Sequence, residues 1–77
     1  MNDTMTSRCA SAATEAARLW ANVRRPTESI SDGFREWWHF ASAELSMWQM
    51  PDAALAAGAA WRKSAERETN RLRRANR

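Results

Sequence analysis

The chain has 77 residues, a formal net charge of +3 and a hydrophobic content of 44%. A domain of this size buries only about 60% of the surface that its unfolded chain exposes, so it depends on dense packing, a metal, disulfides or a partner subunit. Cys9 is the one cysteine and His39 the one histidine, which excludes an internal disulfide and argues against a structural zinc site.

No stretch of the sequence approaches the roughly 20 apolar residues of a membrane-spanning helix. The first 25 residues also lack the apolar segment of a secretory signal. With a lone thiol, these features predict a cytoplasmic protein. Arg outnumbers Lys eleven to one, a codon bias typical of a GC-rich bacterial or phage gene.

Pro26 and Pro51 divide the chain into three segments, each with apolar residues at helical spacing. The first segment predicts a helix over residues 6–25. Its apolar residues recur at alternating steps of four and three, as in the seam of a coiled coil, and Ala13 and Trp20 widen this seam. The seam residues are Met5, Cys9, Ala12, Ala16, Leu19 and Val23.

The second segment predicts a helix over residues 30–49, with Ser29 as its N-cap and Asp32 in its first turn. About half of the circumference of this helix is apolar, and most of these side chains are large. They are Ile30, Gly33, Phe34, Trp37, Trp38, Phe40, Ala41, Leu45, Met47 and Trp48.

The third segment predicts a helix over residues 52–75, because Pro51 and Asp52 both favour a helix start. This helix is longer than the other two, so we expect its basic end, residues 62–77, to project beyond the core. Its apolar face carries mostly small residues: Ala54, Gly58, Trp61, Ala65 and Leu72.

Large side chains on the second helix facing small ones on the first and third would fill space at the density of a protein interior. We therefore predict an all-α fold, a single-domain three-helix bundle over residues 1–77 with the second helix as its aromatic centre. The connection before Pro51 is short. This leaves open an alternative in which the second helix kinks at Pro51 and continues, and a second copy completes the bundle.

The sequence contains five tryptophans. They can fill the core of a domain that is otherwise short of apolar surface, but five indoles of up to about 250 Å² each are hard to enclose in so small a chain. Exposed Trp beside Arg is typical of interface hot spots. The candidates for partner binding are therefore Trp20, Trp38, Trp48 and Trp61, together with Glu44.

Glu44 falls within the apolar arc of the second helix, where an unpaired carboxylate is costly. It either pairs with a cation or an indole N–H, lies on a solvated rim, or marks a face open to a partner. His39 lies opposite the aromatic residues and is expected on the surface. Cys9 is interpreted as a small packing residue and not as a nucleophile.

Residues 1–60 carry a net charge of −2, whereas residues 61–77 carry +5. These cations can complement the dipole at a helix C-terminus, or they can bind a polyanion. No known nucleic-acid-binding signature accompanies them, so any such binding should be weak, non-specific and salt-dependent. The polyanion-binding candidates are Arg62, Lys63, Arg67, Arg71, Arg73, Arg74 and Arg77.

The sequence has no Tyr, no glycine-rich phosphate loop and no metal-ligand pattern, so we expect neither an enzyme nor a cofactor. The expected function is a protein-interaction module, such as an adaptor, an assembly subunit or a stoichiometric inhibitor, with a protein partner or a second copy bound through the Trp-rich surface. Non-specific nucleic-acid binding through residues 62–77 is the alternative. Binding to a membrane or lipid surface ranks third, because the first helix presents mostly alanine.

Overall fold

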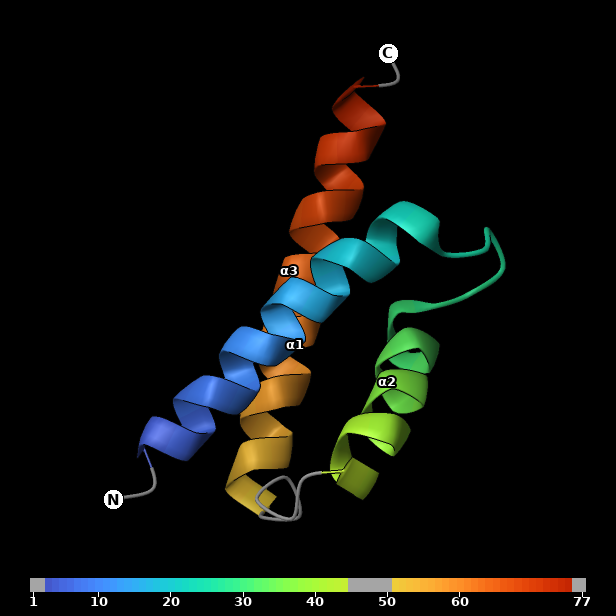
Figure 1. Ribbon diagram of the computed structural model, residues 1–77. Helices are drawn as coiled ribbons and strands as arrows, with labels where there is room; N and C mark the ends of the chain where they lie inside the picture. The colour runs from blue at the N-terminus through green and yellow to red at the C-terminus, as the bar shows by residue number, and fades with distance from the viewer. Residues whose placement is uncertain (1–2, 45–50, 76–77) are drawn as a thin grey trace.

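The computed structural model describes residues 3–44 and 51–75, and their side chains over 6–43 and 52–75 (Figure 1). Three α-helices occur in this part of the chain, with no strand among the described residues. They are α1 (Asp3–Val23), α2 (Ile30–Glu44) and α3 (Pro51–Ala75). The predicted all-α fold with three helices is confirmed.

The first and last helices run parallel to each other, and α2 returns in the opposite direction (Figure 1). Thr14 of α1 contacts Ser64 of α3, and further along both helices Asn22 contacts Glu68. Because α2 and α3 are separate helices that run in opposite directions, the alternative of one kinked helix continuing through Pro51 is wrong.

The helix boundaries differ from the predicted ones mainly at the ends of α1. This helix begins three residues earlier than residue 6 and ends at Val23 instead of residue 25. The earlier end follows from Pro26, which restricts the backbone of the residue before it. The predicted end of α2 at residue 49 lies outside the described residues.

The start of α2 is set by its predicted cap. The hydroxyl oxygen of Ser29 accepts a hydrogen bond of 3.1 Å from the backbone N–H of Asp32, and the Asp32 carboxylate stands in the first turn. Both features stabilise a helix N-terminus, so the prediction of Ser29 as the N-cap is confirmed.

The most deeply buried part of the molecule is the contact between α1 and α3. Small residues recur there at every fourth position, apart from Trp61 on α3, and this i±4 row suits two helices that cross obliquely, as α1 and α3 do in Figure 1. Small side chains let the two backbones approach closely. The buried residues are Cys9, Ala13, Ala17 and Ala21 on α1, and Ala53, Ala57, Trp61 and Ala65 on α3.

The predicted seam of α1 is therefore wrong in part. Ala12 and Leu19 are exposed, and Val23 is 80% exposed. An alternation of four and three suits helices that pack almost in line, whereas helices that cross obliquely follow steps of four. Cys9 belongs to both patterns and is fully buried.

A cluster of aromatic rings joins α2 to the other two helices. The ring of Trp61 lies 5.4 Å from Trp37, 5.6 Å from Trp20 and 5.9 Å from Phe34, measured between centroids. Trp61 is only 2% exposed, and its indole N–H donates a hydrogen bond of 3.0 Å to the backbone oxygen of Ile30. This bond satisfies the polar atom of the largest buried side chain.

The large side chains of α2 cover the core and do not form its centre. Phe34 lies against Gly58 of α3, so a large residue faces a small one there, as predicted. However, Phe34, Trp37 and Trp38 are only partly buried, and Phe40 is 65% exposed. The apolar arc of α2 is wider than the surface that the described parts of α1 and α3 cover.

The two glycines provide a matched test of this packing. A Cβ atom on Gly33 would lie 2.4 Å from the Trp20 indole, whereas one on Gly58 would lie 3.6 Å from Phe34, an ordinary contact. Both Gly→Ala changes gain helix propensity of about 1 kcal/mol. Only Gly33→Ala also overpacks, which costs about 1–3 kcal/mol.

We therefore expect Gly33→Ala to be about 1–3 kcal/mol less stable than Gly58→Ala, measured by urea unfolding followed by circular dichroism. Gly58→Ala should be slightly more stable than the wild type. Equal stability of the two variants would contradict the close contact between α2 and Trp20.

Candidate functional site

An open groove of about 560 Å³ lies between α2 and α3. It is lined mostly by apolar atoms, and partly buried rings form much of its surface. The lining residues are Ile30, Ser31, Phe34, Arg35 and Trp38 from α2, and Ala54, Leu55, Gly58, Ala59, Trp61 and Arg62 from α3.

The groove exists because the two helices carry residues of unequal size. On α2, the rings of Phe34 and Trp38 stack with their centroids 5.8 Å apart and their planes at 30°. On α3, Ala54, Gly58 and Ala59 provide no large side chain to fill the space beside these rings. The floor of the groove is therefore aromatic on the α2 side and consists of small residues, close to bare backbone, on the α3 side.

The edges of the groove combine an apolar and two cationic side chains. Leu55 is 74% exposed and brings an aliphatic side chain to the edge of the groove. Arg35 and Arg62 are also exposed, and none of the described residues that line the groove is Asp or Glu. Among the described residues, neither guanidinium forms an ion pair.

The tryptophan candidates differ in their positions. Trp38 lines the groove, and Trp61 forms part of its floor while its N–H is bonded internally. Trp20 lies elsewhere: its indole N–H donates to a Glu28 carboxylate oxygen at 2.6 Å, and the Arg24 guanidinium sits 5.3 Å from its ring centroid. Trp20 thus secures the loop between α1 and α2.

Two candidates cannot be placed relative to the groove. Trp48 lies outside the described residues, as does the side chain of Glu44. Leu55, Arg35 and Ala59 were not predicted as site residues, because only the pairing of α2 with α3 brings them to one groove. The signal available for Leu55 was a large aliphatic residue off the apolar face of its helix.

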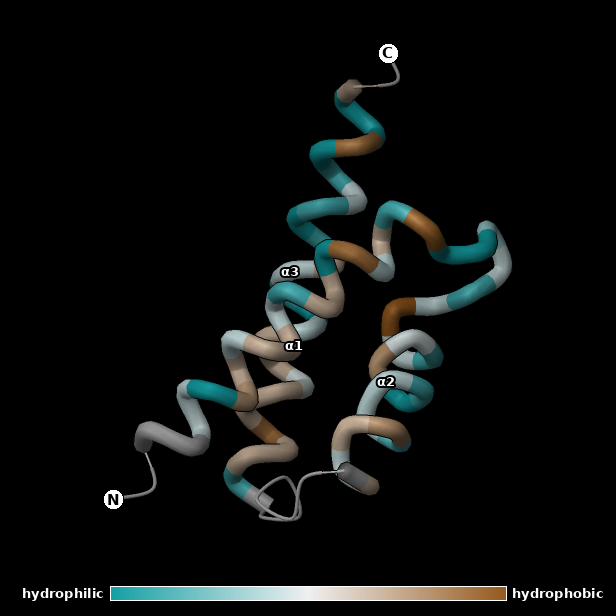
Figure 2. The backbone as a smooth tube through the Cα atoms, viewed as in Figure 1, coloured by the Kyte–Doolittle hydropathy of each residue, from teal (hydrophilic) through white to brown (hydrophobic). Residues whose placement is uncertain are grey.

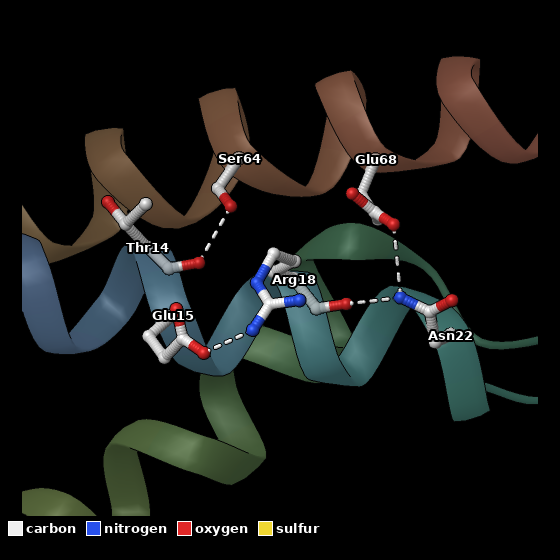
Figure 3. A network of polar contacts seen from close by, with 6 residues as sticks. All are labelled: Thr14, Glu15, Arg18, Asn22, Ser64 and Glu68. Atoms are coloured by element: carbon white, nitrogen blue, oxygen red, sulfur yellow. Dashed lines mark hydrogen bonds and ion pairs between the residues drawn. The ribbon is translucent and has the colours of Figure 1, made fainter.

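A polar network joins α1 to α3 beside the small-residue row (Figure 3). The Ser64 hydroxyl donates to the backbone oxygen of Thr14 at 2.7 Å, and the Asn22 amide donates to Glu68 at 3.1 Å. Glu68 also accepts hydrogen bonds from Arg71, one of them at 2.9 Å. These contacts hold the C-terminal parts of the two helices together.

Glu68 is the one buried charged residue in the described chain. Hydrogen bonds from Arg71 and Asn22 hold the pKa of its carboxyl below the ordinary value, since they stabilise the charged form. On α1, a hydrogen bond from Arg18 likewise lowers the pKa of exposed Glu15. The sequence alone counted Glu68 as a surface charge, although it follows Ser64 by one turn on the side that faces α1.

The C-terminal part of α3 extends past the end of α1, and it is mostly hydrophilic (Figure 2). Lys63, Arg67 and Arg74 share one exposed side with Asn70, at steps of three and four residues. Arg62 and Arg73 are exposed on a neighbouring side. Arg71 is paired with Glu68, and Arg77 lies outside the described residues.

The remaining reactive side chains do not form a centre within residues 6–43 and 52–75. No group of three metal-ligating residues occurs there. His39 is exposed and packs edge-on against Phe40. Burial raises the pKa of the Cys9 thiol, which keeps it protonated and weakly reactive. No helix in the described chain is long and apolar enough to span a membrane.

Comparison with protein-family models, curated proteins and solved structures yields no match for this chain. The groove and the charged surface of α3 are therefore the features that bear on function.

The depressed carboxyl pKa of Glu68 has a consequence for stability. Its contribution is present above the unfolded-state pKa and is lost as the pH falls through the lower folded-state value. We expect the wild type to be more stable than Glu68→Gln at about pH 7, and the difference to shrink toward about pH 3. Urea unfolding at several pH values measures this difference.

The matched control is Glu15→Gln, which removes a carboxylate whose Arg18 partner lies on the same exposed helix face. Its effect should be the smaller of the two, because exposed pairs contribute little. If the difference in unfolding free energy between the wild type and Glu68→Gln does not change with pH, the proposed role of the charged carboxylate is contradicted.

Proposed function

We propose that this protein is a non-enzymatic protein-interaction module and that the groove between α2 and α3 binds a helical segment of another protein. The observation that supports the proposal is an open apolar groove of about 560 Å³ with exposed Leu55 at its edge. Apolar surface of this kind, rimmed by polar residues, is typical of protein interaction sites.

The dimensions of the groove suit a helix. Its lining runs from Ile30 to Trp38 on α2 and from Ala54 to Arg62 on α3. Each stretch covers about 12 Å at a rise of about 1.5 Å per residue, or about two helical turns. An amphipathic helix of that length presents apolar residues at i, i+3 or i+4, and i+7, which would follow the floor from end to end.

The chemistry of the lining favours binding over catalysis. Its polar side chains are the Ser31 hydroxyl and the guanidinium groups of Arg35 and Arg62. Among the described residues, the lining contains no His, Cys, Asp or Glu that could act as a general base toward this hydroxyl. Aromatic rings and arginines are instead the residues enriched at binding hot spots.

A pair of alanine substitutions tests the groove. Ala59 lines the groove and Ala12 lies on α1 outside it, and both are exposed within helices. Ala59→Glu would place a carboxylate under an apolar ligand, where it loses its hydration. We expect Ala59→Glu to weaken partner binding by about tenfold or more, and Ala12→Glu to leave it unchanged.

The measurement has two stages. The wild-type chain captures proteins from a lysate of its source organism, and the partner is identified by its loss from the Ala59→Glu capture but not from the Ala12→Glu capture. Calorimetry with the purified partner then gives the three affinities. Equal affinities, with circular dichroism showing intact helices, would exclude the groove as the binding site.

Nucleic-acid binding through α3 is a second proposal, supported by a separate observation. Lys63, Arg67 and Arg74 are exposed on one side of the helix, and none of them forms an ion pair among the described residues. The Glu68 carboxylate is occupied by Arg71 and Asn22, so it does not neutralise these three cations. Such a row suits phosphates at non-specific positions.

Replacing Lys63, Arg67 and Arg74 together by Gln tests this proposal. The variant should bind duplex DNA more weakly in a gel-shift titration, and the slope of log K against log salt should fall by about 0.9 for each phosphate contact removed. The control replaces exposed Arg8, Arg25 and Arg35 by Gln and so removes the same charge elsewhere. Equal losses in both variants would contradict a specific role for this side of α3.

A further inference from the structure

We infer that the helix bound in the groove is acidic, with carboxylates on both sides of its apolar face that pair with Arg35 and Arg62. This inference rests on the proposed function of the groove and adds the chemistry of the partner. It follows from where the two guanidinium groups lie, from what surrounds them, and from the absence of acidic residues among the described residues of the lining.

The two arginines stand on opposite walls. Arg35 directly follows the floor residue Phe34 on α2, and Arg62 directly follows the floor residue Trp61 on α3. Consecutive residues of a helix are separated by about 100° around its axis. Each arginine is therefore turned from the floor toward the solvent edge of its own helix, and the pair flanks a ligand that lies between the helices.

Neither guanidinium is neutralised by the chain's described residues. Asp32 lies one turn from Arg35 on α2, and Glu66 lies one turn from Arg62 on α3, spacings at which helical ion pairs form. Within residues 6–43 and 52–75, no ion pair is present at either arginine, and neither acid lines the groove. Asp32 and Glu66 therefore do not occupy these two cations.

An apolar floor between two arginines favours one kind of ligand helix. The aliphatic part of an Arg side chain packs on apolar surface while its planar head binds a carboxylate through two parallel hydrogen bonds. A bound helix would exclude water from these contacts and strengthen them relative to exposed pairs. A helix with Lys at the same edges would instead place like charges together and be rejected.

A second copy of this chain is a weaker occupant. Among the described residues, its most exposed aromatic side chain is Phe40 on α2, with exposed Glu36 one turn before it. This patch offers a single large anchor among the described residues, whereas the groove is about two turns long. If Phe40 of one copy entered the groove of the next copy, each copy would use two different surfaces of α2. Such a head-to-tail contact forms an open chain of copies and not a closed dimer.

The test uses two fluorescein-labelled helical peptides, each constrained by a hydrocarbon staple. Both carry Leu at i, i+4 and i+7, and the residues that flank this row are Glu in one peptide and Lys in the other. Fluorescence anisotropy is measured with the wild type, with Ala59→Glu, and with the double variant Arg35→Glu, Arg62→Glu. The double variant changes exposed residues only and leaves the floor intact.

We expect the wild type to bind the Glu peptide about tenfold or more tightly than the Lys peptide. The preference should invert in the double variant, and added salt should weaken it. Equal affinity for the two peptides, with loss of both in Ala59→Glu, would overturn the acidic inference but leave the groove as a binding site. Binding of neither peptide would also overturn the inference. The capture of a partner from the lysate then tests the proposed function separately.

Two further arms identify other occupants. Sedimentation velocity is measured on the wild type, Phe40→Ser and Ala59→Glu. If the wild type self-associates and both variants are monomeric, the occupant of the groove is a second copy and the inference is overturned. Flotation with anionic phospholipid vesicles would overturn it in favour of a lipid surface if the wild type floats and Ala59→Glu does not. A monomeric wild type that does not float supports the acidic helix.

Discussion

Small side chains repeat every fourth residue on the facing sides of α1 and α3, and the close approach that they allow determines the rest of the structure. Cys9, Ala13 and Ala17 meet Ala53, Ala57 and Ala65 with no exposed surface or almost none. Such a contact favours an oblique crossing of the two helices. They consequently diverge toward their ends, and α2 lies along the side of α3 in one of the spaces that this leaves.

The aromatic residues supply the buried apolar area that this alanine-rich contact lacks. Small side chains bury little apolar area each, and hydrophobic stabilisation scales with buried area. Trp61 compensates, because it is large, fully enclosed and bonded to α2 through the backbone of Ile30. The other rings gather around it from α2 and from Trp20, so α2 is attached at its aromatic side, and its edge toward Leu55 stays open as the groove.

Periodicity, capping and proline positions predicted three helices with nearly correct starts for α2 and α3, because these signals are local. The pairing of faces is not local. Leu19 and Val23 are more hydrophobic than Ala17 and Ala21, so the sequence favoured them as core, but the close approach of α1 and α3 admits only the small residues. Glu68 was missed for the same reason, since its partner Asn22 lies 46 residues away.

The groove was the least predictable feature. Trp38 and Trp61 were selected by residue type, and both line it, but Trp20 was selected on the same grounds and belongs to the loop contact with Glu28. Residue type predicts that an indole seeks a partly polar surrounding. It does not say whether that surrounding is supplied by the chain itself or by another molecule.

The parallel pairing of α1 with α3 also governs how the chain folds. The most enclosed part of the core brings together the first and last helices, and the bond between Thr14 and Ser64 spans 50 residues of sequence. Closing so long a segment has an entropic cost, and it raises the contact order above that of a bundle whose contacts are mostly local. Both α1 and α3 must therefore be present before the core can form, and the chain is expected to fold as one cooperative unit, with no stable two-helix intermediate.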